Sequence, residues 1–326
     1  MRLGKAAALA VLCSGSALAQ GIDPLDAQVE LDDARRFADV FARTNGAPTA
    51  EDLESGYLNG AGRGVEVFTP YRIQNGENLA AAVARNTEHY QRGIDVCLPI
   101  AEDMSSELRA VYLGLQGLYP DAELPRIYAV FGANNSGGTA GATEQVLGLE
   151  VICRIAETEE DIRATFRAFF AHETVHVLQT SGGWAVAQKD PLLAQTLIEG
   201  MADYVAELVT GRSINPERDE WGEANEAMLW AAFQKDRAII NAGVARGETF
   251  QDQSPESSAA FRRWHGNAGS PPEGWHGEAG YWVGAQIIAA YVERADNRRE
   301  ALEELLVITD PVKVLEMSGY AEKFAN

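Results

Sequence analysis

AHETVHVLQ, residues 171–179, lies in the middle of a long predicted helix. Residues four apart in a helix lie on one face, about one turn from each other, so the rings of His172 and His176 can reach the same ion. Glu173 projects beside them, toward the open side of such an ion. The chain has only five histidines, so this H-E-x-x-H spacing is rare by chance. It predicts a metal site, with two core histidines as the alternative.

The next predicted helix supplies acidic residues. Glu199 follows His176 after a loop and lies among apolar neighbours, where an unpaired carboxylate is costly. We predict Glu199 as the third zinc ligand and Asp203, one turn later, as the acid that orients a ligand histidine. The alternative for Glu199 is a solvated helix charge. A third histidine nearby is excluded, because Gln179 and Gly182 stand where the pattern H-E-x-x-H-x-x-G-x-x-H needs Gly and His.

Local signals set the ends of both helices. The first begins at a capping pair formed by Thr158 and Asp161, and it runs to about Thr180, before a Ser-Gly-Gly sequence. The second helix begins at Asp190-Pro191 and ends at Gly211. Between residues 191 and 211 the apolar residues recur every four positions, which predicts one buried stripe.

The rest of the chain predicts a mainly helical α+β fold. Further helices are expected over 26–43, after the N-cap Thr49, and over 77–94, 101–118 and 217–241, and helices resume at Tyr281. Two β-rich runs, 127–131 and 146–152, flank a polar glycine-rich segment and predict a small sheet beside the H-E-x-x-H helix. Residues 243–280 form a candidate lid or substrate loop. We expect one domain, 20–326, with approximate lobes at 20–182 and 183–326.

The N-terminus and the charge balance indicate an exported protein. Residues 1–19 carry two basic residues, an apolar stretch and an A-x-A-like end, which is typical of a cleaved secretory signal peptide. The predicted location is therefore periplasmic or secreted. A net charge of −21 argues against nucleic acid as a partner. No later apolar run is long enough for a membrane span.

Two cysteines remain after the signal peptide. In an oxidising compartment Cys97 and Cys153 can form one disulfide. Both also lie in apolar runs where a packed free thiol is common, so the two alternatives stay open. Neither has the spacing of a metal ligand.

The pattern His172-Glu173-x-x-His176 followed by Glu199-x-x-x-Asp203 resembles the gluzincin clan of zinc metallopeptidases, the thermolysin-like group. More narrowly, three groups of segments resemble a bacterial family of predicted zinc-dependent proteases that is related to a gliding-motility lipoprotein. These segments are 135–139 with 148–150, 171–179 with 198–208, and 280–284. The resemblance implies a zincin-like domain with a helical C-terminal lobe.

The resemblance also implies roles for individual residues. His172, His176 and Glu199 would hold Zn²⁺, Glu173 would act as general base on the zinc-bound water, and Asp203 would steady a ligand. For a second group that stabilises the oxyanion, the candidates are Tyr281, then His276, then His265. The backbone of Gly137, Gly138 and Thr139 could pair with an extended peptide, although a solvent turn is an equally good interpretation.

The sequence thus predicts an exported zinc peptidase that acts on a peptide or protein substrate. The alternative is a non-catalytic, zinc-containing factor for binding or assembly in the cell envelope. Glu173 favours the enzyme, because a purely structural zinc site needs no base beside the ion.

Overall fold

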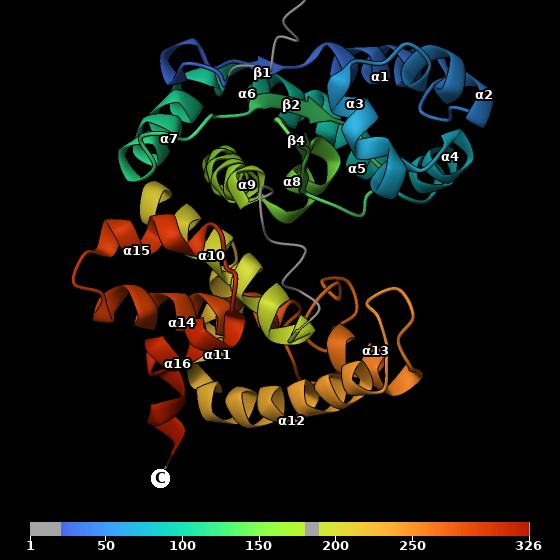
Figure 1. The fold of residues 1–326 in the computed structure, drawn as a ribbon. Helices are drawn as coiled ribbons and strands as arrows, with labels where there is room; N and C mark the ends of the chain where they lie inside the picture. The colour runs from blue at the N-terminus through green and yellow to red at the C-terminus, as the bar shows by residue number, and fades with distance from the viewer. Residues whose placement is uncertain (1–20, 180–188, 326) are drawn as a thin grey trace, which may run out of the picture.

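The computed structural model describes residues 21–179 and 189–325. About 67% of the described residues are helical, and within them four short strands form one mixed sheet, which confirms the predicted mainly helical α+β class. Figure 1 shows the sheet and the N-terminal helices in one part of the molecule and the C-terminal helices in the other. The predicted signal peptide, the Ser-Gly-Gly helix stop and the predicted lobe boundary lie outside the described residues.

The sheet is small and mixed. Its strands are β1 (Val29–Glu30), β2 (Arg126–Val130), β3 (Gly138–Ala140) and β4 (Glu144–Gly148), in the order β1-β2-β4-β3. β2 pairs in parallel with both β1 and β4, and β3 is an antiparallel edge strand. All five residues of β4 are buried, as expected for a parallel strand that is covered on both faces. The second β-rich run therefore differs from prediction: the strand ends at Gly148, and a helix begins at Leu149.

The N-terminal helices surround this sheet. The first predicted helix is shorter than expected, because its first residues form η1 and β1 instead, and the predicted helix over 77–94 breaks at Asn86. Thr49 caps its helix through a capping box with Asp52. The elements are η1 (Pro24–Asp26), α1 (Asp32–Arg43), α2 (Ala50–Leu53), η2 (Glu54–Leu58), α3 (Arg63–Phe68), η3 (Thr69–Ile73), α4 (Gly76–Arg85), α5 (Thr87–Arg92), η4 (Gly93–Cys97), α6 (Leu98–Asp103), α7 (Ser105–Leu118) and α8 (Leu149–Ile155).

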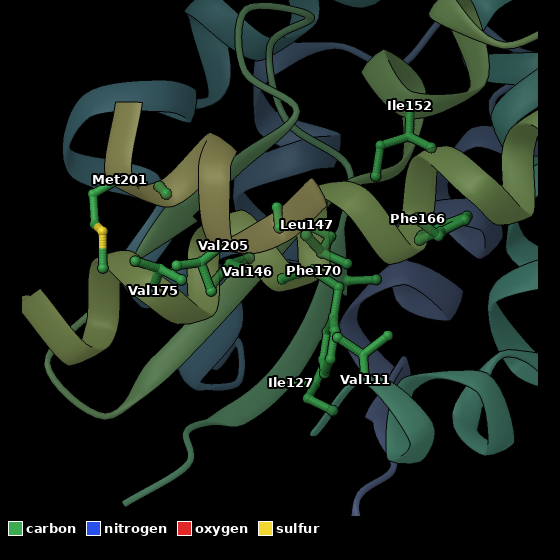
Figure 2. Packing of buried hydrophobic residues seen from close by; sticks show 14 of the residues in the cluster. Val111, Ile127, Val146, Leu147, Ile152, Phe166, Phe170, Val175, Met201 and Val205 are labelled. Atoms are coloured by element: carbon green, nitrogen blue, oxygen red, sulfur yellow. The ribbon is translucent and has the colours of Figure 1, made fainter. Parts of the chain in front are cut away.

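Helix α9 (Glu159–Gln179) lies between the sheet and the C-terminal helices. Its apolar side chains pack against those of β2 and β4 and against helix α10 (Pro191–Thr210), as Figure 2 shows for Phe170, Val175 and their neighbours. One polar contact fixes its position: the buried amide of Gln145 in β4 donates to the Thr174 hydroxyl over 2.6 Å. The His-Glu pattern therefore begins in a stretch of the helix, residues 170–175, that is buried throughout.

All the named elements in the described residues 189–325 are helices. α10 packs against both α9 and α14, and Figure 1 shows α12 along the far side. The predicted helix over 217–241 is two helices that meet at Asn225, and the predicted loop over 243–280 contains α13. The elements are α11 (Pro216–Ala224), α12 (Glu226–Ala245), α13 (Pro255–Arg262), α14 (Ala279–Arg294), α15 (Arg298–Leu305), α16 (Pro311–Ser318) and η6 (Tyr320–Phe324).

Two findings bear on the cellular setting. Cys97 in η4 and Cys153 in α8 form a disulfide, with their Cα atoms 5.8 Å apart, which settles the alternative left open above. Among the described residues, no helix combines the length and the apolar character that a membrane crossing requires.

Candidate metal centre

Three donor atoms from two helices converge on one point. The Nε2 atoms of His172 and His176 lie 2.9 Å apart, and Glu199 Oε2 lies 3.1 Å from His176 Nε2 and 3.5 Å from His172 Nε2. We call these three residues the metal cluster. Donors bound at 2.0–2.1 Å to a tetrahedral zinc are roughly 3.3 Å from one another. The three observed separations bracket that value.

Hydrogen bonds fix which nitrogen of each ring faces the cluster. His172 Nδ1 lies 2.8 Å from Asp203 Oδ1, and His176 Nδ1 lies 2.8 Å from Gln179 Oε1. The Gln179 amide donates to the Ile198 carbonyl, so its oxygen is turned toward His176. With both Nδ1 atoms donating, the neutral rings would present both Nε2 lone pairs to a cation held beside Glu199. The donor set thus fits a divalent cation.

Electrostatics in the metal cluster favour positive charge. Burial lowers the pKa of His172, but hydrogen bonds to Asp203 and Glu199 outweigh burial and raise it well above its usual value. Burial raises the pKa of Glu199, but His176 and His172 hold it well below its usual value. The metal-free cluster therefore attracts protons, and a bound cation would take their place.

Glu173 lies next to the edge strand of the sheet. It is 7% exposed, and burial raises the pKa of its carboxyl group, while the charges of His172, His176 and Arg72 oppose that rise. A methyl group added at Gly138 in β3 would come within 2.5 Å of Glu173 Oε1. The glycine therefore permits the close approach of strand and carboxylate.

The other predicted backbone positions lie along the same edge. Gly137 precedes β3, and a methyl group there would meet the ring of Phe169. Thr139 pairs with Val146 of β4 through one side of β3. Since β3 is last in the strand order, its other side is an edge of the sheet.

The three predicted partners of the cluster lie in different surroundings. The ring of Tyr281, at the start of α14, stacks on that of His172 with centroids 6.0 Å apart. The ring of His265 lies beside Tyr281, and its Nε2 is 2.9 Å from the Thr196 hydroxyl on α10. The ring of His276 packs instead against Trp221. The structure therefore brings Tyr281 next to the cluster and places His276 on an aromatic surface of α11.

Sequence reasoning missed three residues that hold the site in place. Gln195 donates to Glu199 Oε1 over 2.8 Å, one turn before it on α10, and Gln179 holds His176. Both lie three or four residues from their partners on one helix, a spacing that the sequence shows. The third is Arg218 on α11, whose guanidinium pairs with Asp203 Oδ2 over 2.8 Å. Nothing in the sequence connects Arg218 with Asp203.

Part of the chain matches the model of a known protein family. The family described as "Gliding motility protein GldB" matches residues 182–322, which is less than half of the chain. The matched region contains Glu199, Asp203, Arg218 and Tyr281, whereas the His-Glu pattern on α9 lies before it. No curated protein matches the chain, and neither does any solved structure.

This match corrects the predicted activity. The matching family is a gliding motility family and no protease family matches, so the assignment to the gluzincin clan or to a family of zinc-dependent proteases is wrong. The prediction of a secreted or periplasmic peptidase, and with it the class of hydrolase, is therefore also wrong. The physical reason is that two histidines four residues apart report only that a helix can present two imidazoles to one ion. This spacing does not indicate which reaction, if any, takes place at that ion.

Proposed function

We propose that this chain is a zinc-containing factor for binding or assembly in the cell envelope. The observation that carries the proposal is the family match, because the matched residues 182–322 include Glu199, one of the three residues of the metal cluster, and Asp203, which orients a second one, His172. The metal is then part of what that region does, rather than a feature of a separate enzyme domain.

The location follows from the same match and from the chain itself. A gliding motility family, a disulfide between Cys97 and Cys153, and a predicted secretory signal peptide are each compatible with a site outside the cytoplasm. With no spanning helix among residues 21–179 and 189–325, the described part would work beside a membrane or away from it.

The metal cluster leaves one coordination position on the ion for a binding partner. When bound, zinc would take His172, His176 and Glu199 as ligands and leave a fourth position for a donor atom, which we assign to a partner protein or peptide. The edge strand β3 lies beside Glu173, so an extended partner segment could pair with its backbone next to the ion. We propose that the sheet, α9 and α10 form a zincin-like arrangement that would serve this purpose as a scaffold.

Glu173→Gln distinguishes a binding role from a chemical one. In the organism that makes this chain, the gene is deleted and replaced by the parent, by Glu173→Gln or by Glu199→Ala. We expect Glu173→Gln to keep its zinc and to reverse the effect of the deletion fully, as the parent does, since binding needs no base. We expect Glu199→Ala to be exported at the parental level, to lose its zinc and to fail, since it lacks a ligand.

Two results would contradict the proposal in different ways. A zinc-loaded Glu173→Gln protein that fails to restore the phenotype would show that proton transfer at Glu173 is required, which excludes a non-catalytic role. A Glu199→Ala protein that lacks zinc and still restores the phenotype would show that the metal has no part in the function.

A further inference from the structure

A chain of charged and polar side chains leads from the buried metal cluster into α11. His172 Nδ1 lies 2.8 Å from Asp203 Oδ1, and Asp203 Oδ2 lies 2.8 Å from Arg218 Nη2. Arg218 also pairs with Asp219, with its Nε and Nη2 atoms 2.9 and 2.8 Å from Oδ1. Asp219 in turn accepts from the Ser213 hydroxyl. Four side chains thus connect the ring of a metal ligand to a segment far along the sequence.

Arg218 is the central member of this chain. It is 2% exposed, although burying a guanidinium group away from water is costly. Its guanidinium carbon also lies 5.7 Å from the centroid of the Tyr281 ring, and its backbone N–H is held by the N-cap side chain of Asn215. Its position is therefore fixed by α10, α11 and α14 together.

The geometry of a carboxylate gives this arrangement a consequence for the metal. Asp203 has two oxygens, and each accepts from a different partner, His172 on one side and Arg218 on the other. A carboxylate that is held at both oxygens cannot rotate about its own bond without breaking one contact. The plane of Asp203 fixes the direction of the His172 Nδ1–H bond, and that direction fixes where Nε2 points.

We propose that Arg218 is a positioning residue of the metal centre, which holds Asp203 so that His172 presents its Nε2 atom to the ion. This inference rests on the proposed zinc site. It makes Arg218 more than a buried ion pair that stabilises the fold. The guanidinium fork matters beyond its charge, because it engages Asp203 and Asp219 at the same time.

The chain offers a matched control for the alternative that Arg218 only stabilises the fold. Arg237 on α12 pairs with Asp190 over 2.7 Å, and Asp190 is 2% exposed. That pair is comparable in length, its arginine side chain is 17% exposed against 3% for Arg218, and its carboxylate lies at the start of α10, nine residues before Glu199. Loss of either arginine should lower the melting temperature, but only loss of Arg218 should change zinc binding.

The experiment compares the zinc affinities of folded proteins. The parent, Arg218→Gln, Arg218→Lys and Arg237→Gln are titrated with Zn²⁺ against a chelator of known affinity, below the melting temperature of each variant. We expect Arg218→Gln to weaken binding about tenfold, in the range found for partners of ligand histidines, and Arg218→Lys to weaken it about threefold. Arg237→Gln should bind zinc as the parent does. The absorption bands of bound Co²⁺ should shift in both Arg218 variants and not in Arg237→Gln.

The possible failures separate the two proposals. If the parent binds zinc and both Arg218 variants bind it with parental affinity and parental Co²⁺ bands, Arg218 has no positioning role and this inference is overturned, while the zinc site stands. If the parent itself binds no zinc, the proposed function fails as well. If Arg218→Gln does not fold, Arg218→Lys decides the question, because it keeps the buried charge and changes only the geometry.

Discussion

His265 lies close to the metal cluster without joining it. It is 5% exposed, and one ring nitrogen bonds to the Thr196 hydroxyl, while Nδ1 has no partner among the described residues. Burial lowers the pKa of His265 to about 4, and the charge of Glu199 offsets only part of this effect. The folded protein therefore keeps this ring neutral at neutral pH.

This burial predicts a loss of stability in acid. The pKa of His265 is lower in the folded chain than its usual 6.5, so the unfolded chain takes up a proton first as the pH falls. The associated stability is fully present above about pH 6.5 and is lost as the pH falls toward 4, which amounts to about 2 kcal/mol between pH 8 and pH 5. Urea unfolding of the parent and of His265→Gln at both pH values measures it. Equal losses in both proteins would contradict the prediction.

Among single residues, those on α9 and α10 were the most predictable. Within each helix, His172 could be related to His176 and Glu199 to Asp203 from the sequence, because helical spacing sets which side chains share a face. Arg218 could not, because its contact with Asp203 depends on how α11 packs against α10 and α14. Tertiary packing of this kind leaves no local pattern.

At the scale of elements, α10 and α14 meet at two glycines. A methyl group added at Gly284 would lie 1.9 Å from the carbonyl oxygen of Thr196, and one added at Gly200 would lie 2.1 Å from the backbone of Gly284. The two helices therefore touch backbone to backbone. This contact sets the distance between Glu199 on α10 and Tyr281 on α14.

Gly284→Ala should force the two helices apart. Because the overlap is with backbone atoms rather than a flexible side chain, we expect a loss of about 3 kcal/mol in the free energy of unfolding. Gly117→Ala on α7 is the control, since a methyl group there meets no atom within 4 Å and alanine is the better helix former. Chemical unfolding compares the two variants. A Gly284→Ala protein as stable as the parent would show that the helices do not make this contact.

The ends of elements were predictable where a local device sets them. Thr158 caps α9 through the Asp161 backbone N–H, and Gly211 ends α10 with a φ of 72°. The predicted end of an element was wrong where a strand and the helix after it have the same apolar composition. Leu149, Val151 and Ile152 read as a continuation of β4, yet they belong to α8, because their apolar, β-branched pattern does not distinguish a short buried strand from a short buried helix.

At the scale of the molecule, the metal cluster joins two distant parts of the chain. His172 and His176 belong to the helix that packs on the sheet, and Glu199 belongs to the helix that packs on the C-terminal bundle. A cation held by all three would bind the folded chain and not the unfolded one. Bound zinc should therefore raise the stability of the whole molecule, by an amount set by its concentration relative to its dissociation constant.

The zinc content of the exported protein, purified from metal-replete medium, tests this account most directly. We expect about one zinc per chain in the parent and in Glu173→Gln, and almost none in Glu199→Ala, with the melting temperature of the parent falling when zinc is removed by a chelator. A parent that carries less than about 0.3 zinc per chain, with a melting temperature that the chelator leaves unchanged, would contradict the central claim that His172, His176 and Glu199 hold a metal ion.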